Sequence, residues 1–222
     1  VYVYWNNRRA RVPDMYKLNI KTGVPRLVAR GPDLDSMEVI YNVWTDKDGM
    51  PEALMTDVGI QRVIYTYDMN SKKWSEHYRY TCQEPHFTPV VIVDYETENK
   101  ETENKRLWLV SGQKFDKQRN VIEDNDTNSL YLYDPETKEF SDTMFKDDRY
   151  DVGGYTGGCR GSGGISATVD PETKKLTELT YVAEEPKRIY FDDLYTDEDE
   201  ESDEIKFSTR QLRESLESLF PN

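Results

Sequence analysis

The stretch YLYDPETKEF, residues 131–140, fits a strand, a tight turn and a returning strand into ten residues. Its two tyrosines alternate with Leu132 in the two-residue period of a β-strand, and the turn begins directly after them. Pro135 fixes φ at the second turn position, and the Asp134 carboxylate can accept backbone N–H bonds two or three residues further on. These residues therefore predict a β-hairpin.

The same unit occurs four times along the chain. In each copy an Asn or Asp is followed three positions later by Ser or Thr, and then by Gly or Lys; the pairs are Asn19–Thr22, Asp68–Ser71, Asp134–Thr137 and Asp170–Thr173. An Asx residue that bonds its own backbone is typical of a turn. Four copies indicate a repeat architecture, and they are more informative than any catalytic motif in the chain.

The spacing of these turns favours a β-propeller. The intervals between the four Asx residues are 49, 66 and 36 positions, and the longest contains a direct duplication, ETENK at 96–100 and 101–105. A period of about 40–50 residues with several strands is typical of propeller blades, which bury their faces only against neighbouring blades. We expect an all-β fold, part of a propeller of four-stranded antiparallel blades over residues 1–193, in an incomplete ring.

The last thirty residues change character. Residues 192–204 hold nine acids and no base, and we expect residues 194–206 to be an acidic linker. A helix is expected over 207–222, because its leucines and Phe220 recur at helical spacing, Ser208 and Gln211 are spaced as a capping box, and Pro221 ends it.

Composition narrows the classes of partner. The net charge of -14 argues against nucleic acid, whose binding needs clustered Lys and Arg, and the chain has no apolar run long enough to span a membrane.

Cys82 and Cys159 are either bridged or two free thiols, with free thiols favoured. We expect a cytoplasmic location; the glycosylation acceptor at 125–127 leaves secretion open. The chain begins with VYVYW, which reads as the middle of a strand, so we expect a piece of a longer polypeptide.

Neither a metal nor a cofactor is expected. Cys82 and His86 have the spacing of zinc ligands, but the chain lacks a second pair. Residues 124–128 resemble the start of a calcium loop, yet Ser129 replaces the turn glycine and Pro135 stands where the twelfth-position Glu belongs. The glycine-rich residues 153–164 lack the Gly-Lys-Ser/Thr of a P-loop.

Four segments in order along the chain resemble a known family. Residues 7–16, 44–51 (WTDKDGMP), 62–65 (RVIY) and 150–154 (YDVGG) are similar to the propeller domain of prolyl oligopeptidase-type serine peptidases, in the dipeptidyl aminopeptidase and acylaminoacyl-peptidase branch. The C-terminal Leu-Phe-Pro also resembles the helix from which that family continues into its catalytic domain. Glu52 departs from the pattern, which has Arg after the Asp-x-Asp-Gly-x-Pro turn.

The resemblance implies a nucleophilic Ser in a Gly-x-Ser-x-Gly elbow on an α/β-hydrolase domain. This chain lacks that elbow: Ser162 comes closest, but Arg160 occupies the first glycine position. His77 and His86 both precede Ser162, which reverses the family's order. We therefore expect no catalytic residue in this chain.

By the same resemblance, the propeller covers the active site and admits only short peptides, so its partners are the hydrolase domain of the same polypeptide and a peptide substrate. Arg8, Arg9 and Arg160 are candidates to bind a peptide carboxylate through their guanidinium groups, or they are ordinary surface arginines. Homo-oligomerisation is left open. The alternative is a stand-alone, propeller-like interaction scaffold whose acidic run binds a basic partner.

Overall fold

The computed structural model describes residues 1–9, 12–34, 38–46, 48–81, 83–95, 105–122, 127–153, 164–170, 173 and 175–191. These residues form fourteen β-strands and no helix, which confirms the expected all-β class. The predicted helix at 207–222 and the predicted linker at 194–206 lie outside the described residues.

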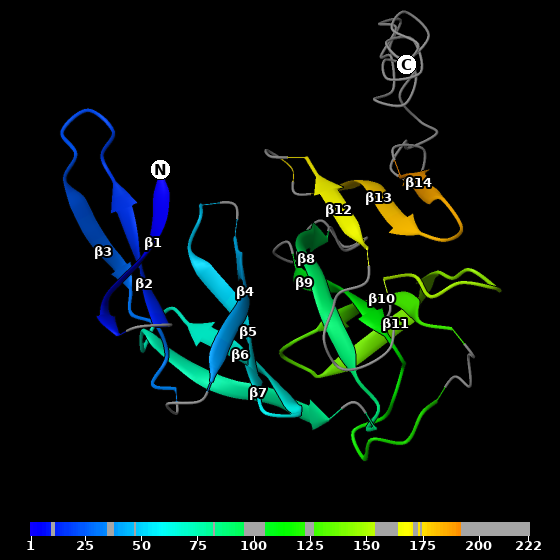
Figure 1. The fold of residues 1–222 in the computed structure, drawn as a ribbon. Coiled ribbons are helices and arrows are strands. Elements are labelled where there is room, and N and C mark those ends of the chain that lie inside the picture. Colours follow the sequence, from blue (N-terminus) through cyan, green and yellow to red (C-terminus); the bar gives the residue numbers. More distant parts are fainter. Residues whose placement is uncertain are drawn as a thin grey trace, which may run out of the picture.

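Four antiparallel sheets follow one another along the chain (Figure 1). The first sheet contains β1 (Tyr2–Arg9), β2 (Val12–Leu18) and β3 (Pro25–Ala29). The second contains β4 (Val39–Thr45), β5 (Pro51–Val58), β6 (Gln61–Asp68) and β7 (Lys73–Thr81). The third contains β8 (Phe87–Tyr95), β9 (Lys105–Gly112), β10 (Ser129–Asp134) and β11 (Glu139–Phe145). The fourth contains β12 (Ser166–Val169), β13 (Leu176–Val182) and β14 (Pro186–Tyr190).

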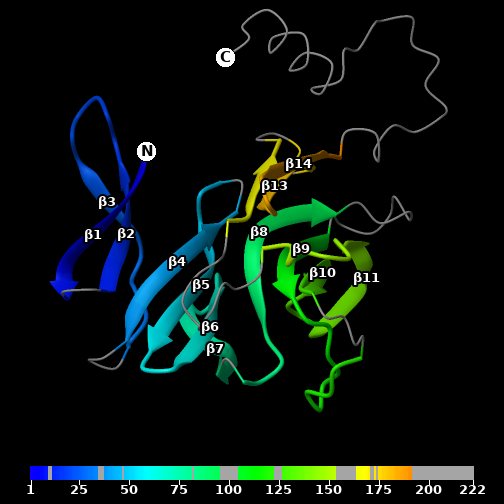
Figure 2. The ribbon, with the colours of Figure 1, turned by 45° about the vertical axis from the view of Figure 1, so that its right-hand side comes forward.

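Neighbouring strands in each sheet are consecutive in sequence and antiparallel. The second and third sheets have the four strands expected of a blade, whereas the described parts of the first and fourth sheets have three. Three successive sheets bring their first strands together, since β4 and β12 both contact β8. In Figure 2, β8 runs between the second sheet and the rest of the third.

The faces of the sheets are buried against each other. All six residues of β10 are buried, because neighbouring sheets cover both of its faces. Between the second and third sheets, the ring of Tyr78 stacks on those of Phe87 and Phe115, with centroids 5.5 and 5.4 Å apart. Aromatic stacks of this kind add about 0.5–1.5 kcal/mol per pair beyond the area that they bury.

A second apolar cluster joins the third and fourth sheets. Leu109 and Leu130 of the third sheet and Leu179 of the fourth are fully buried in it. Asp147, in the loop after β11, reaches the fourth sheet through hydrogen bonds from the Tyr181 hydroxyl (2.6 Å) and from Lys187 Nζ (2.8 Å). Packing and polar contacts therefore fix the fourth sheet on the third.

Candidate functional site

In all four repeat turns the Asx side chain accepts hydrogen bonds from residues two or three positions further on. Asp134 Oδ1 accepts from Glu136 N at 2.9 Å, and Asp134 Oδ2 accepts from Thr137 Oγ1 at 2.8 Å. Asp68 receives equivalent bonds from Asn70 N and Ser71 Oγ, both at 2.8 Å. In the other two copies, Asn19 accepts from the backbone N–H groups of Lys21 and Thr22, and Asp170 accepts from the N–H and hydroxyl of Thr173. The Asx side chain and the Ser or Thr three positions on therefore serve to hold the turn.

The residue after that Ser or Thr adopts a left-handed backbone in three copies. Its φ is +69° at Gly23, +55° at Lys72 and +60° at Lys138. Glycine adopts this conformation freely, whereas a lysine there is strained by its Cβ. The Gly-or-Lys position that recurs in the sequence is thus a site of positive φ.

The fourth turn occupies a different place in its sheet. The first three connect β2 to β3, β6 to β7 and β10 to β11, which are the last two strands of their sheets, whereas the Asp170 turn connects β12 to β13. Because β12 contacts β8 as β4 does, β12 holds the first-strand position. The 36 positions between Asp134 and Asp170 therefore do not connect equivalent turns of successive sheets. Turn spacing alone gives too short a period at this point of the chain.

Two of the three candidate arginines lie in a described strand. Arg8 and Arg9 lie at the end of β1, where Arg9 pairs with Val12 of β2. Arg160 lies outside the described residues, as do Ser162, Cys82 and Cys159. The peptide-carboxylate role of these arginines stays a prediction.

Both histidines are engaged in packing contacts. His77 Nε2 lies 2.8 Å from the Tyr133 hydroxyl, and burial, with a smaller effect from the charge of Lys138, lowers the pKa of His77 to about 4. His86 Nδ1 lies 2.8 Å from the carbonyl oxygen of Glu84, and its ring stacks on Tyr80. Among the described residues, neither histidine contacts a serine or threonine hydroxyl as a catalytic base would.

Glu52 has an ion-pair partner where the family pattern has an arginine. Nη1 of Arg106, in β9, lies 3.3 Å from Glu52 Oε2 and 3.8 Å from Asp46 Oδ2. The pair crosses from the second sheet to the third. The acid at position 52 is thus matched by a cation on the next sheet.

A cavity of about 230 Å³ lies where the first strands of three sheets meet. Tyr41, Asn42 and Trp44 of β4 line one wall, and the others come from Met55 of β5, Thr88–Val90 of the third sheet and residues 165–167 around the start of β12. The Trp44 indole N–H fixes this junction by donating to the carbonyl oxygen of Val90 at 3.1 Å. The described lining residues offer hydroxyl, amide and apolar groups, and none of them is charged.

This inner-strand cavity has no signature in the sequence. Its described walls come from segments spread over residues 41–167, and no motif identifies them as parts of one cavity. Only the mutual packing of β4, β8 and β12 brings them together. Uncharged polar groups beside apolar surface can bind a peptide backbone and a neutral side chain.

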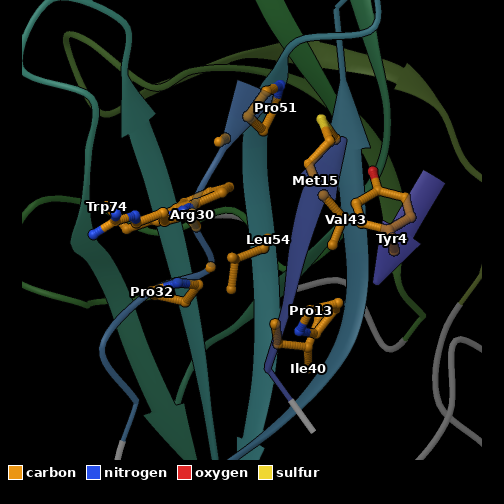
Figure 3. Close-up of a pocket in the computed structure, with 12 residues that line it drawn as sticks. Tyr4, Pro13, Met15, Arg30, Pro32, Ile40, Val43, Pro51, Leu54 and Trp74 are labelled. Atoms are coloured by element: carbon orange, nitrogen blue, oxygen red, sulfur yellow. The ribbon is translucent and has the colours of Figure 1, made fainter. Parts of the chain in front are cut away.

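A second hollow lies between the first and second sheets (Figure 3). Tyr4, Pro13 and Met15 line it from the first sheet, and Val43, Leu54 and Trp74 line it from the second. Its volume is only about 20 Å³, room for a single water. The Trp74 indole N–H donates to the carbonyl oxygen of Arg30 at 2.8 Å and closes the seam. This hollow is a packing seam between sheets.

The described residues contain no cluster of three or more His, Cys, Asp or Glu side chains that could hold a metal ion. No described segment forms a helix long and apolar enough to cross a membrane.

Comparisons of the chain with protein-family models, with curated proteins and with solved structures find no match.

Proposed function

We propose that this chain is the non-catalytic propeller part of a prolyl-oligopeptidase-like serine peptidase, which limits and orients the peptides that reach an active site elsewhere in the polypeptide. The observation that carries the proposal is the meeting of β4, β8 and β12. Successive small antiparallel sheets with adjacent first strands have the arrangement of propeller blades around an axis.

The chemistry of the inner-strand cavity suits this role. At about 230 Å³ it is smaller than the roughly 300–1,000 Å³ of pockets for drug-sized ligands. A space of this size admits one or two amino-acid residues. Because its described polar side chains, which include Tyr41, Asn42, Thr88 and Ser166, are uncharged, it offers hydrogen bonds to a peptide backbone without selecting a charge.

The residues of this chain support a non-catalytic role. Hydrolysis by a serine peptidase needs a nucleophile, a base within hydrogen-bond reach and an oxyanion hole. The sequence has no Gly-x-Ser-x-Gly elbow, and both histidines make packing contacts. The nucleophile must then come from outside residues 1–222.

Labelling of the native full-length polypeptide with a fluorophosphonate probe tests the proposal. We expect one labelled serine outside residues 1–222, with labelling unchanged by Ser162→Ala. Modification of Ser162 would overturn the proposal. A full-length polypeptide without any labelled serine would also overturn it, in favour of the stand-alone interaction scaffold.

The selectivity role has a separate test. Ser166→Phe places a ring at the inner-strand cavity, whereas Thr168→Phe adds the same bulk two residues along β12, outside the cavity lining. In the full-length enzyme we expect Ser166→Phe to lower kcat/KM more for tetrapeptide than for dipeptide substrates. Equal effects of the two variants would contradict passage of substrate past this cavity.

A further inference from the structure

A larger groove lies between the first and second sheets, lined by strands of the first and by the β4–β5 and β6–β7 connections of the second. Its volume is about 330 Å³, and it shares no residue with the inner-strand cavity. Its lining includes Tyr2, Lys17, Arg26, Met50, Met69 and Lys72. We call it the cationic groove, because three of its described lining residues are cations and none of them is acidic.

The cations are held close together by strand register. Lys17 of β2 pairs with Arg26 of β3 across the hairpin, and Tyr2 of β1 pairs with Lys17 on the other side. Like charges directly opposite each other in a sheet are destabilising. Lys72 joins them from the β6–β7 turn of the second sheet.

None of the three cations is neutralised within the described part of the chain. Lys17, Arg26 and Lys72 are all exposed, and none forms an ion pair with a described carboxylate. The chain as a whole carries a net charge of -14. In this acidic protein, the charged residues among the described lining of the groove are all cations, and a bound anion would relieve their mutual repulsion.

The cationic groove also contains apolar surface, part of which comes from two flexible methionine side chains. Lys17 Nζ lies 5.5 Å from the centroid of the Tyr2 ring, and Met69 is 47% exposed. Met50 lines the groove from the β4–β5 connection. Methionine side chains are flexible and polarisable, and they adapt to different apolar partners. Cations beside methionines suit a ligand that carries both carboxylates and an apolar side chain.

We propose that the cationic groove binds an acidic peptide segment of a partner protein. Lys17, Arg26 and Lys72 take its carboxylates, and Met50 and Met69 contact an apolar side chain between them. Charge complementarity selects this occupant. A nucleic acid is a poorer fit, since three cations neutralise few phosphates and the rest of the protein repels the polymer. The inference does not depend on the proposed peptidase function.

Fluorescence anisotropy with the labelled peptide Glu-Glu-Leu-Phe-Glu-Glu, on the full chain, tests this site. We expect saturable binding that weakens at least tenfold in Lys17→Gln/Arg26→Gln and weakens as salt rises, because the charges are exposed. Lys146→Gln, at an exposed lysine in the loop after β11, should bind like the wild type. The peptide Gln-Gln-Leu-Phe-Gln-Gln should bind at least tenfold more weakly.

The two strained lysines provide a matched pair that separates folding from binding. Lys72→Gly and Lys138→Gly both relieve a positive φ, so both should raise the urea midpoint. Only Lys72 lines the groove, so only Lys72→Gly should weaken peptide binding. A loss of affinity in a more stable variant cannot arise from unfolding.

Four results would overturn the proposal. The first is no binding of the acidic peptide by the wild type at millimolar concentration, and the second is equal binding of the glutamine peptide. The third is tighter binding of single-stranded dT12 than of the acidic peptide. The fourth is self-association that Lys17→Gln/Arg26→Gln abolishes, which would assign the groove to a second copy of the chain.

Discussion

His77 of β7 and Tyr133 of β10 meet edge to face across the seam between the second and third sheets, with ring planes at 81° and the imidazole Nε2 2.8 Å from the hydroxyl oxygen. Trp108 packs beside them, with its ring centroid 5.2 Å from that of His77. Burial raises the pKa of Tyr133 and lowers that of His77, so both side chains are neutral at pH 7. The contact is part of the seam that joins the two sheets.

The half-buried His77 predicts a loss of stability in mild acid. Its pKa is about 4 in the folded protein and about 6.5 when unfolded. The unfolded state therefore binds more protons between pH 6.5 and 4, and the free energy of unfolding falls as pH drops through that window, by up to about 3 kcal/mol. Urea unfolding at pH 7.5, 5.5 and 4.5 measures the slope. His77→Gln should flatten it, and an equally steep slope in that variant would contradict the assignment.

Two repeat turns with the same hydrogen bonds should differ in their response to alanine. Asp134 is only 6% exposed, whereas Asp68 is exposed. Removal of the Asp134 carboxylate leaves donors of Glu136 and Thr137 without their acceptor in a partly buried turn, at a cost of about 1–3 kcal/mol. Asp68→Ala should cost less, because water replaces the lost bonds. Chemical denaturation compares the two, and equal losses would show that burial does not set the cost.

Gly112 has no room for a side chain where β9 ends beside β8. An added Cβ would meet the carbonyl oxygen of His86 and lie 2.6 Å from Phe87 Cα. These are backbone atoms that cannot rotate away, so Gly112→Ala should destabilise the fold by about 1–3 kcal/mol. Gly59→Ala is the control, since an added Cβ there meets nothing within 4 Å and bears only the strain of φ +62°. The melting temperature should fall further for Gly112→Ala.

The Asp147 carboxylate should govern how firmly the fourth sheet is held. Its bonds from Lys187 and Tyr181, with that from the backbone N–H of Arg149, hold its pKa well below the usual range. The stabilisation is present above the unfolded pKa near 4 and is lost as pH falls through the folded value. Asp147→Asn should speed amide exchange in residues 176–190 and leave β9 and β10 unchanged. Asp148→Asn, whose side chain is 88% exposed, should change neither.

Local sequence patterns predicted the hairpins because they act within a few residues. The Asx residue, the following Ser or Thr and the Gly or Lys after it correspond to specific bonds and to a positive φ. The position of each turn within its sheet was harder to predict from the sequence. The Asp170 turn has the same Asx and Thr pattern as the others, yet it follows the first strand of its sheet. The contact between β12 and β8 shows that β12 is that first strand.

Candidate binding residues were harder to predict than turns. Clustered arginines such as Arg8 and Arg9 attract notice in a sequence, but the cations that share a groove are Lys17, Arg26 and Lys72, which are spread over 56 positions. No local pattern marks them, because strand register pairs the first two and sheet packing adds the third.

The sequence by itself determined the all-β class, the hairpins and the turn chemistry, since alternation of side chains and Asx turns depend on neighbouring residues. Tertiary structure decided which strands came first in their sheets, where the inner-strand cavity opens and which cations share a groove. These features depend on contacts between residues far apart in the chain. Their positions follow from how the faces of the sheets bury one another, and no short stretch of sequence contains that information.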